Sequence, residues 1–288
     1  MLLTEFFILF LSLLVCGVKE GDEVIVPTWT FVATSHVVLW CGARPVLCDV
    51  EEETLNIDVG QMERLVTSRT KAIIPVHFAG YPCKMDEIVN IANRYRLMVI
   101  EDAAHAHGAM IDGVKAGNIG DIGCFSFYPT KPMTVGGEGG IVATNDEKIS
   151  KKVRSIIDVE SSKGTSISYN FRMSEIQAAI GRVQLKRFPE FKRIRQSLAK
   201  RYYEKLKDIP YIELLNHNYD EVVPHIFPIK IVNGKRDELR QYLLSKNIEC
   251  GIHYYPNHLL SFYGNRKGEL PVTEKSVSYT HLTLPTKA

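Results

Sequence analysis

Short apolar runs alternate with amphipathic segments through the first hundred residues of the chain. The runs lie within 21–27, 44–50, 71–78 and 98–103, and each has consecutive apolar residues at its centre, as is typical of strands buried on both faces of a sheet. Segments with a helical period lie between them, at 30–42, 56–66 and 84–96. This order predicts an α/β fold with a mainly parallel sheet, whose strands deliver ligand-binding groups to one edge.

The first of these predicted helices has recognisable capping residues at both ends. Thr28 or Thr30 precedes the apolar period and is expected to cap the N-terminus with its hydroxyl. Gly42 follows the last periodic residue and is expected to end the helix.

After residue 108 the pattern changes to shorter elements. A turn-rich segment at 112–117 predicts a hairpin, and apolar runs at 122–128 and 139–146 predict two further strands, the second antiparallel to its neighbours. Residues 170–208 form one long helical stretch, which we expect to break or bend near Pro189. A small α+β unit follows, with a strand, a helix and a strand expected at 224–232, 235–247 and 248–255.

The chain therefore divides into a large domain over residues 1–205, expected to be incomplete at its N-terminus, and a small, incomplete C-terminal domain over residues 206–276. The last residues, 277–288, show no helical period, and most of them resemble one reading frame of a common sequencing adapter. We expect this last segment to be a foreign addition and leave it out of the predicted fold.

The apolar run from Phe6 to Cys16 has two interpretations. It resembles a secretory signal or anchor, but the preceding residues contain no Lys or Arg and include Glu5. It is also too short to span a bilayer comfortably. The alternative is a buried first helix whose natural beginning is missing.

Composition excludes several classes of protein. The chain has 288 residues, of which 45% are hydrophobic and 24% charged, as is typical of a soluble globular protein. The net charge of +2, without a basic run carrying aromatic residues, argues against a nucleic-acid partner. Six scattered cysteines without a CxxC pair indicate reduced thiols, neither a metal site nor a disulfide framework. We expect a cytoplasmic protein without a membrane partner.

Candidate chemistry is concentrated between residues 98 and 144. Asp102 ends one predicted strand, and Lys131 follows another in the apolar run FSFYPTKPM. Most lysines lie at the surface and many such aspartates are caps. Together on adjacent strand ends, however, an acid and a buried amine of lowered pKa suit a Schiff-base site. In such a site Asp102 would bond a pyridinium nitrogen.

Other side chains are weaker candidates for the same site. His105 either bonds the cofactor's phenolic oxygen or is structural, and His107 is expected to be structural, with no third ligand spaced for a metal. Phe31 is a core aromatic or stacks on a flat ring. Ser126 and the amides near the glycine cluster at 136–140 are candidates for holding a phosphate.

Several runs together resemble the DegT/DnrJ/EryC1/StrS family of sugar aminotransferases. The resemblance covers about Gly17 to Lys275, with its motifs in the family's order. It is carried by EDAAHAHGA (101–109), GDIGCFSFYPTK (120–131), GGEGGIVATND (136–146) and YNFRMSEIQAAIGRVQL (169–185), with support from GDEVIVPTWTFVAT upstream and HYYPNH downstream.

The resemblance implies the fold of aspartate aminotransferase, with a large PLP-binding domain, and the cofactor pyridoxal 5′-phosphate (PLP). By motif, Lys131 would be the Schiff-base lysine and Asp102 the pyridinium partner. The implied cofactor and substrate contacts are those of His105 near the hydroxyl, Phe31 on the ring, Ser126 at the phosphate, Asn170 at the phosphate of the neighbouring subunit in a homodimer, and His253 and Tyr254 near the sugar nucleotide.

The implied reaction moves an amino group from L-glutamate to a keto group of a nucleotide-linked sugar. Family members that are dehydratases carry histidine in place of the lysine, so Lys131 favours transamination. A PLP-dependent dehydratase and an inactive remnant remain as alternatives. The family's phosphate-binding turn contains glycine, whereas LLTEFFILF (2–10) has none, so we expect this chain to bind PLP poorly.

Overall fold

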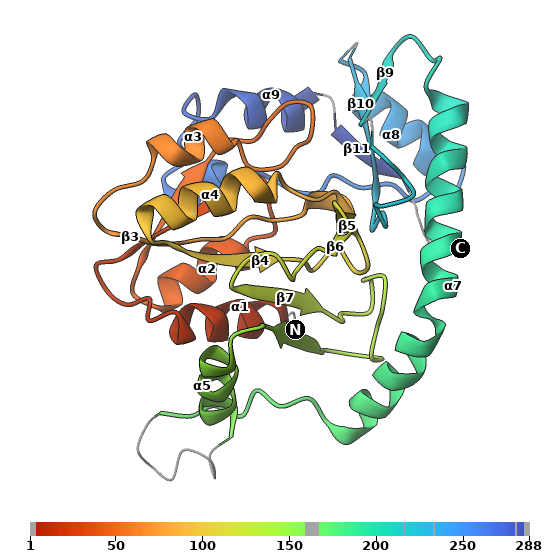
Figure 1. Ribbon diagram of the computed structural model, residues 1–288. Coiled ribbons are helices and arrows are strands. Elements are labelled where there is room, and N and C mark those ends of the chain that lie inside the picture. The colour runs from red at the N-terminus through yellow and green to blue at the C-terminus, as the bar shows by residue number, and fades with distance from the viewer. Residues whose placement is uncertain (1–3, 159–166, 216, 233, 280, 285–288) are drawn as a thin grey trace.

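The computed structural model describes residues 4–158, 167–215, 217–232, 234–279 and 281–284 (Figure 1). Its centre is a six-stranded sheet in which only the last strand is antiparallel to its neighbour. In spatial order the strands are β2 (Arg44–Cys48), β1 (Glu23–Pro27), β3 (Thr70–Ile73), β4 (Met98–Asp102), β7 (Ile122–Ser126) and β8 (Gly140–Ala143). The predicted α/β architecture and the antiparallel last strand are confirmed.

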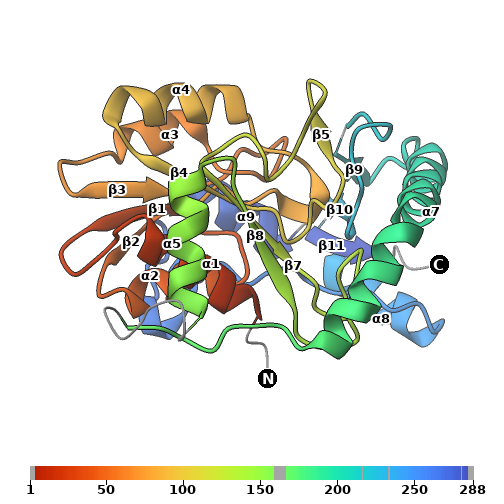
Figure 2. The same cartoon turned by 60° about the horizontal axis from the view of Figure 1, so that its bottom comes forward.

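Helices cover both faces of this sheet (Figure 2). On one face, α3 (Val59–Arg64) and α4 (Met85–Tyr95) pack on a cluster that includes Ile25 of β1. On the other, α1 (Thr4–Val15), α2 (Ala33–Trp40) and α5 (Glu147–Ile157) pack on a cluster that includes Val24 and Val26. Successive residues of β1 thus pack into cores on opposite faces of the sheet, which explains why residues 24–27 are all apolar.

The apolar N-terminal run forms helix α1, and its leucines are part of the core. Leu9 and Leu13 are wholly buried against the sheet. Of the two interpretations of this run, the structure shows the buried helix. Among the described residues, no helix has both the length and the apolar character to cross a membrane.

The predicted cap of α2 is wrong. Its N-cap residue is Val32, and no side chain caps the helix. The Thr30 hydroxyl instead lies 3.0 Å from that of Thr34, and the Thr28 hydroxyl lies 2.7 Å from Nδ1 of His258. Both hydroxyls therefore have side-chain partners other than the helix end, that of Thr30 four residues away and that of Thr28 in a distant segment.

A short hairpin, β5 (Met110–Ile111) with β6 (Val114–Lys115), follows β4 as predicted. The long helix α7 (Glu175–Leu206) begins with a capping box between Ser174 and Gln177 and runs unbroken through Pro189. Figure 1 shows α7 following one side of the molecule from the large domain to the small one. The proposed domain boundary at 205/206 falls in its last turn.

The small domain contains a three-stranded antiparallel sheet in the order β11-β10-β9. Its elements are β9 (Ile212–Leu214), β10 (Phe227–Ile231), α8 (Arg236–Ser245), the 3-10 turns η2 (Asn257–Leu259) and η3 (Ser261–Tyr263), α9 (Pro271–Tyr279) and β11 (His281–Leu284). The prediction of a strand over 248–255 is wrong, because this segment has an irregular backbone and crosses to the large domain. There the carbonyl of His253 accepts a hydrogen bond from Trp29 Nε1 at 2.9 Å.

The segment left out of the predicted fold also makes contacts. Helix α9 extends past residue 276, and β11 pairs with β10. Val277 and Leu284 are buried in the small-domain core. Val277 and Leu284 of this segment thus take part in the core, whereas the foreign origin of the segment stays a prediction.

Candidate active site

Asp102 ends β4 at the carboxyl edge of the sheet and is almost completely buried. Its Oδ2 accepts a hydrogen bond from the Thr34 hydroxyl at 3.0 Å, and its Oδ1 accepts one from the Ala104 N–H at 3.2 Å. In the parallel pairing of β4 with β7, Asp102 lies opposite Cys124. The strand that precedes Lys131 is therefore its direct neighbour.

Lys131 lies in a tight turn after β7, where its N–H donates to the Tyr128 carbonyl at 2.8 Å. The side chain is buried, with 8% of the residue exposed. Its charge helps to lower the pKa of four histidines, namely His105, His107, His225 and His253. Lys131 therefore lies close enough to these four rings for its charge to act on them.

His105 follows Asp102 and is packed between side chains of both domains. Its Nε2 lies 3.2 Å from the Tyr254 hydroxyl, and its ring centroid lies 4.3 Å from that of His225. Its Nδ1 is buried and has no hydrogen-bond partner among the described residues. Burial first, and then the charge of Lys131, holds the pKa of His105 well below its usual range, so the ring is neutral at pH 7.

His225 was not predicted. It precedes β10 in the small domain, and its own N–H donates to the Ala79 carbonyl at 2.8 Å. Burial and the neighbouring His105 hold the pKa of His225 well below its usual range. A lone histidine before a strand matches no sequence motif, so its contact with His105 is found only in the tertiary structure.

His107 has the surroundings of a structural residue. Its ring lies 5.5 Å from that of Phe125 and 5.8 Å from that of Phe127, measured between centroids. Burial, and then the Lys131 charge, lowers the pKa of His107 to about 3.

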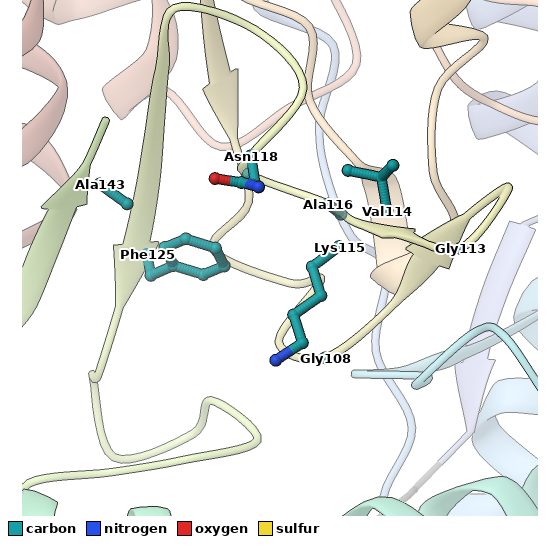
Figure 3. Close-up of a pocket in the computed structure, with 9 residues that line it drawn as sticks. Gly108, Gly113, Val114, Lys115, Ala116, Asn118, Phe125 and Ala143 are labelled. Carbon is teal, nitrogen blue, oxygen red and sulfur yellow. The ribbon is translucent and has the colours of Figure 1, made fainter. Parts of the chain in front are cut away.

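A pocket of about 520 Å³ lies beside Phe125, under the hairpin of β5 and β6 (Figure 3). Because successive side chains of a strand point to opposite faces, this pocket is on the face of β7 away from Ser126.

The aromatic candidates Phe31 and Tyr254 pack next to the His105 ring. Phe31 is half-buried, with its ring centroid 5.7 Å from that of Tyr254. Tyr254 and His253 belong to the segment that crosses from the small domain, and burial followed by the Lys131 charge lowers the pKa of His253. The structure therefore brings Phe31, His253 and Tyr254 together with His105.

Ser126 and Asn170, the two proposed phosphate contacts, lie in different surroundings. Ser126 is wholly buried at the end of β7, where its Oγ accepts the Tyr128 N–H at 3.3 Å. The Ser126 hydroxyl can still donate. Asn170 is exposed, on a segment held on α1 by Phe171, whose ring stacks on Phe7 at 4.3 Å. The described contacts do not bring Asn170 into the cluster of its own chain.

The fold and this cluster define a PLP-dependent aminotransferase. The S. venezuelae protein DesV matches with a TM-score of 0.92 and 35% identity, over 98% of this chain and 77% of that one. The PLP-form of the sugar aminotransferase Spr1654 from Streptococcus pneumoniae matches with a TM-score of 0.91 and 27% identity, over 99% and 81%. Spr1654 has also been solved in its PMP-form.

The chain belongs to the DegT/DnrJ/EryC1/StrS aminotransferase family, whose model matches residues 8–288. Among its relatives, a GDP-perosamine synthase of Caulobacter vibrioides is 36% identical over 294 residues, which cover 97% of this chain and 78% of that protein. The predicted family, enzyme class and PLP cofactor are confirmed.

The residues of the cluster fit PLP. A buried carboxylate (Asp102) suits a protonated ring nitrogen, and a buried amine (Lys131) suits the cofactor's aldehyde. The buried Nδ1 of His105, without a partner among the described residues, offers a hydrogen bond to the ring hydroxyl. Phe31 supplies an aromatic face beside it.

Proposed function

We propose that this chain transfers an amino group from L-glutamate to a keto group of a nucleotide-linked sugar, with Lys131 and Asp102 as its catalytic residues. The single observation that carries the residue assignment is the burial of Lys131 among histidines of lowered pKa, on the strand beside Asp102. Sugar aminotransferase chemistry is common to the family. The nucleotide linkage is supported by a relative that is named for GDP-perosamine.

Each residue has a definite task in this proposal. When bound, PLP supplies an electron-withdrawing ring that stabilises negative charge beside the reacting amine. The Asp102 carboxylate keeps a proton on the ring nitrogen. The Lys131 Nζ would hold the cofactor at its aldehyde carbon, C4′. Once displaced by the amino donor, it would remove the proton from the donor's Cα and return a proton at C4′, on the other side of the amino nitrogen.

The neutral histidines support this task electrostatically. With the pKa values of His105, His225 and His253 lowered by burial and by Lys131, none of these three imidazoles carries a positive charge at pH 7. His105 is proposed to bond the ring hydroxyl through Nδ1, and Ser126 to bind the phosphate. His253 and Tyr254, which reach the cluster from the small domain, are proposed to contact the sugar nucleotide.

We further propose a homodimer with shared sites. Large apolar side chains are exposed around the start of α7, with Ile176 at 75%, Leu185 at 61% and the nearby Ile167 at 78% exposure. Such a patch is typical of a surface covered by a partner. Asn170 lies in the same region and would reach the phosphate of the second subunit. The six cysteines, all free thiols in the structure, support a site of action in the reducing cytoplasm.

The test is the half-reaction with L-glutamate in the presence of excess PLP. An aminotransferase forms one 2-oxoglutarate per active site without any sugar substrate, and Lys131→Ala abolishes it. A dehydratase or a lyase forms none. An inactive chain forms none either and fails to react with PLP at Lys131.

A further inference from the structure

A buried hydrogen bond joins the side chains of Glu101 and His77 next to the proposed site. Both side chains are wholly buried, and Oε2 of Glu101 lies 2.9 Å from Nε2 of His77. Glu101 precedes Asp102 on β4, so the two carboxylates point to opposite faces of the sheet. The proposed mechanism uses Asp102 and leaves Glu101 without a task.

The Glu101 carboxylate accepts hydrogen bonds from three backbone N–H groups of the loop over residues 117–120, in addition to the one from His77. The Gly117 N–H donates to Oε2 at 2.7 Å, and the N–H groups of Ile119 and Gly120 donate to Oε1 at 2.7 and 2.6 Å. Burial acts to raise the pKa of Glu101, but the hydrogen bonds from His77 and from the backbone donors outweigh burial and hold this pKa below its usual value. The carboxylate is thus ionised at pH 7 and has four donors.

His77 joins this carboxylate to the backbone around Asp102. Its Nδ1 accepts the Cys83 N–H at 3.1 Å, which assigns the ring proton to Nε2, facing Glu101. Its own backbone N–H donates to the Asp102 carbonyl at 3.1 Å. The Asp102 N–H in turn donates to the Pro75 carbonyl at 2.9 Å. His77 therefore binds Glu101 through its ring and Asp102 through its backbone N–H.

The loop that Glu101 holds leads directly into β7 and hence to Lys131. This loop packs without clearance on β7, because a Cβ atom added to Gly123 would lie only 2.0 Å from the Gly117 carbonyl oxygen. Figure 3 shows Asn118 of the loop on the same side of β7 as Phe125. Fixing the loop to Glu101 therefore also fixes β7 against β4, the strand that carries Asp102.

We propose that Glu101 and His77 are positioning residues that set the placement of Lys131 relative to Asp102. Neither residue touches the substrate or the cofactor in this proposal, which rests on the roles assigned to Asp102 and Lys131 above. Positioning has a large effect on rate, since a displacement of about 1 Å can cost roughly 100-fold. Loss of the Glu101 charge is therefore expected to lower the rate of the chemical step without abolishing cofactor binding.

The experiment compares Glu101→Gln with Glu23→Gln in the full chain loaded with PLP. Glu23 is a matched control, since its side chain is also wholly buried and is bound by Arg44, Arg69 and Thr67. It is the first residue of β1 and so lies at the edge of the sheet opposite to the proposed site. Measured quantities are kcat and KM for the glutamate half-reaction, the visible circular dichroism of the bound cofactor, and stability to urea.

For Glu101→Gln we expect kcat to fall by at least about tenfold, KM to stay within about threefold, and the visible dichroism to change. For Glu23→Gln we expect lower stability with kcat and dichroism unchanged. Wild-type kcat and dichroism in Glu101→Gln would overturn the proposal, because a purely structural pair affects stability alone. A wild-type chain that forms no 2-oxoglutarate would instead contradict the proposed function, and this proposal with it.

A second pair of variants covers the case in which Glu101→Gln does not fold. His77→Gln retains an N–H donor for Glu101, whereas His77→Leu removes it and leaves three backbone donors in place. We expect His77→Gln to keep at least about tenfold more of the wild-type kcat than His77→Leu does. Equal kcat values for these two variants would overturn the proposal.

Discussion

The hydroxyl oxygen of Tyr254 lies 3.2 Å from Nε2 of His105, and this contact joins the small domain to the carboxyl edge of the central sheet. The two residues are separated by 149 positions in the chain. Phe31, in the segment between β1 and α2, approaches the same tyrosine, with 5.7 Å between ring centroids. The site therefore depends on three distant segments being packed together.

Removal of this hydroxyl tests how much the contact stabilises the chain. We expect Tyr254→Phe to lower the free energy of unfolding by about 1–2 kcal/mol, because the buried Nε2 of His105 loses its partner. Urea denaturation measures the change. Tyr255→Phe, at a neighbouring tyrosine with 58% exposure, is the control and should change stability by less than about 0.5 kcal/mol. Equal effects for the two variants would contradict this account of the contact.

Stability should fall in acid because of His107. The pKa of His107 is lowered to about 3 in the folded chain, by burial and then Lys131, from 6.5 when unfolded. Between these values the unfolded state binds the extra proton, so stability rises with pH, and below about pH 6.5 it declines by about 1.4 kcal/mol per pH unit for this one group. His107→Leu should reduce the slope of unfolding free energy against pH by one proton. An unchanged slope would contradict the lowered pKa.

Gly80 holds the turn beneath His105 at a place where no side chain fits. Its φ is +97°, and an added Cβ would lie 2.4 Å from the Val223 carbonyl oxygen and 2.9 Å from that of His105. We expect Gly80→Ala to cost about 3 kcal/mol or more, from the left-handed backbone and the clash together. Gly264→Ala, with φ of +87° and nothing within 4 Å, should cost only the backbone part, about 1–2 kcal/mol. Thermal unfolding of both variants makes the comparison.

Much of the site could be predicted because parallel strands deliver their last residues to one edge. The apolar runs in the sequence predicted β4 and β7. Asp102 and Ser126 end these two strands, and Lys131 follows the second of them. Phe31 was also a candidate from the sequence alone. The family resemblance then added His253 and Tyr254, and the structure brings all three to His105. The roles of these residues in binding and catalysis stay predictions.

What could not be predicted depends on contacts between distant segments. Nothing local distinguishes His225, which reaches His105 only through the packing of the small domain. The Glu101 carboxylate is bound by backbone N–H groups, which have no side-chain signature. The error at 248–255 has the same origin, because a β-like run there is held by Trp29 of the large domain instead of a neighbouring strand.

PLP affinity is expected to be low. Residues 2–10 lack the glycine of the family's phosphate-binding turn, and in the structure Phe6 of the first turn of α1 stacks on Trp40 at 5.1 Å and lies 6.0 Å from Phe31. We expect the visible absorption of bound cofactor to reach saturation only with PLP in large molar excess over the chain. Saturation near one equivalent would contradict this expectation.

The most direct test of the central claim is to locate the covalent bond between PLP and the chain. Borohydride reduction in the presence of excess PLP, followed by proteolysis and mass spectrometry, identifies the modified lysine. The account predicts modification at Lys131, and loss of both this label and 2-oxoglutarate formation in Lys131→Ala. Modification at another lysine, or undiminished transamination by Lys131→Ala, would contradict it.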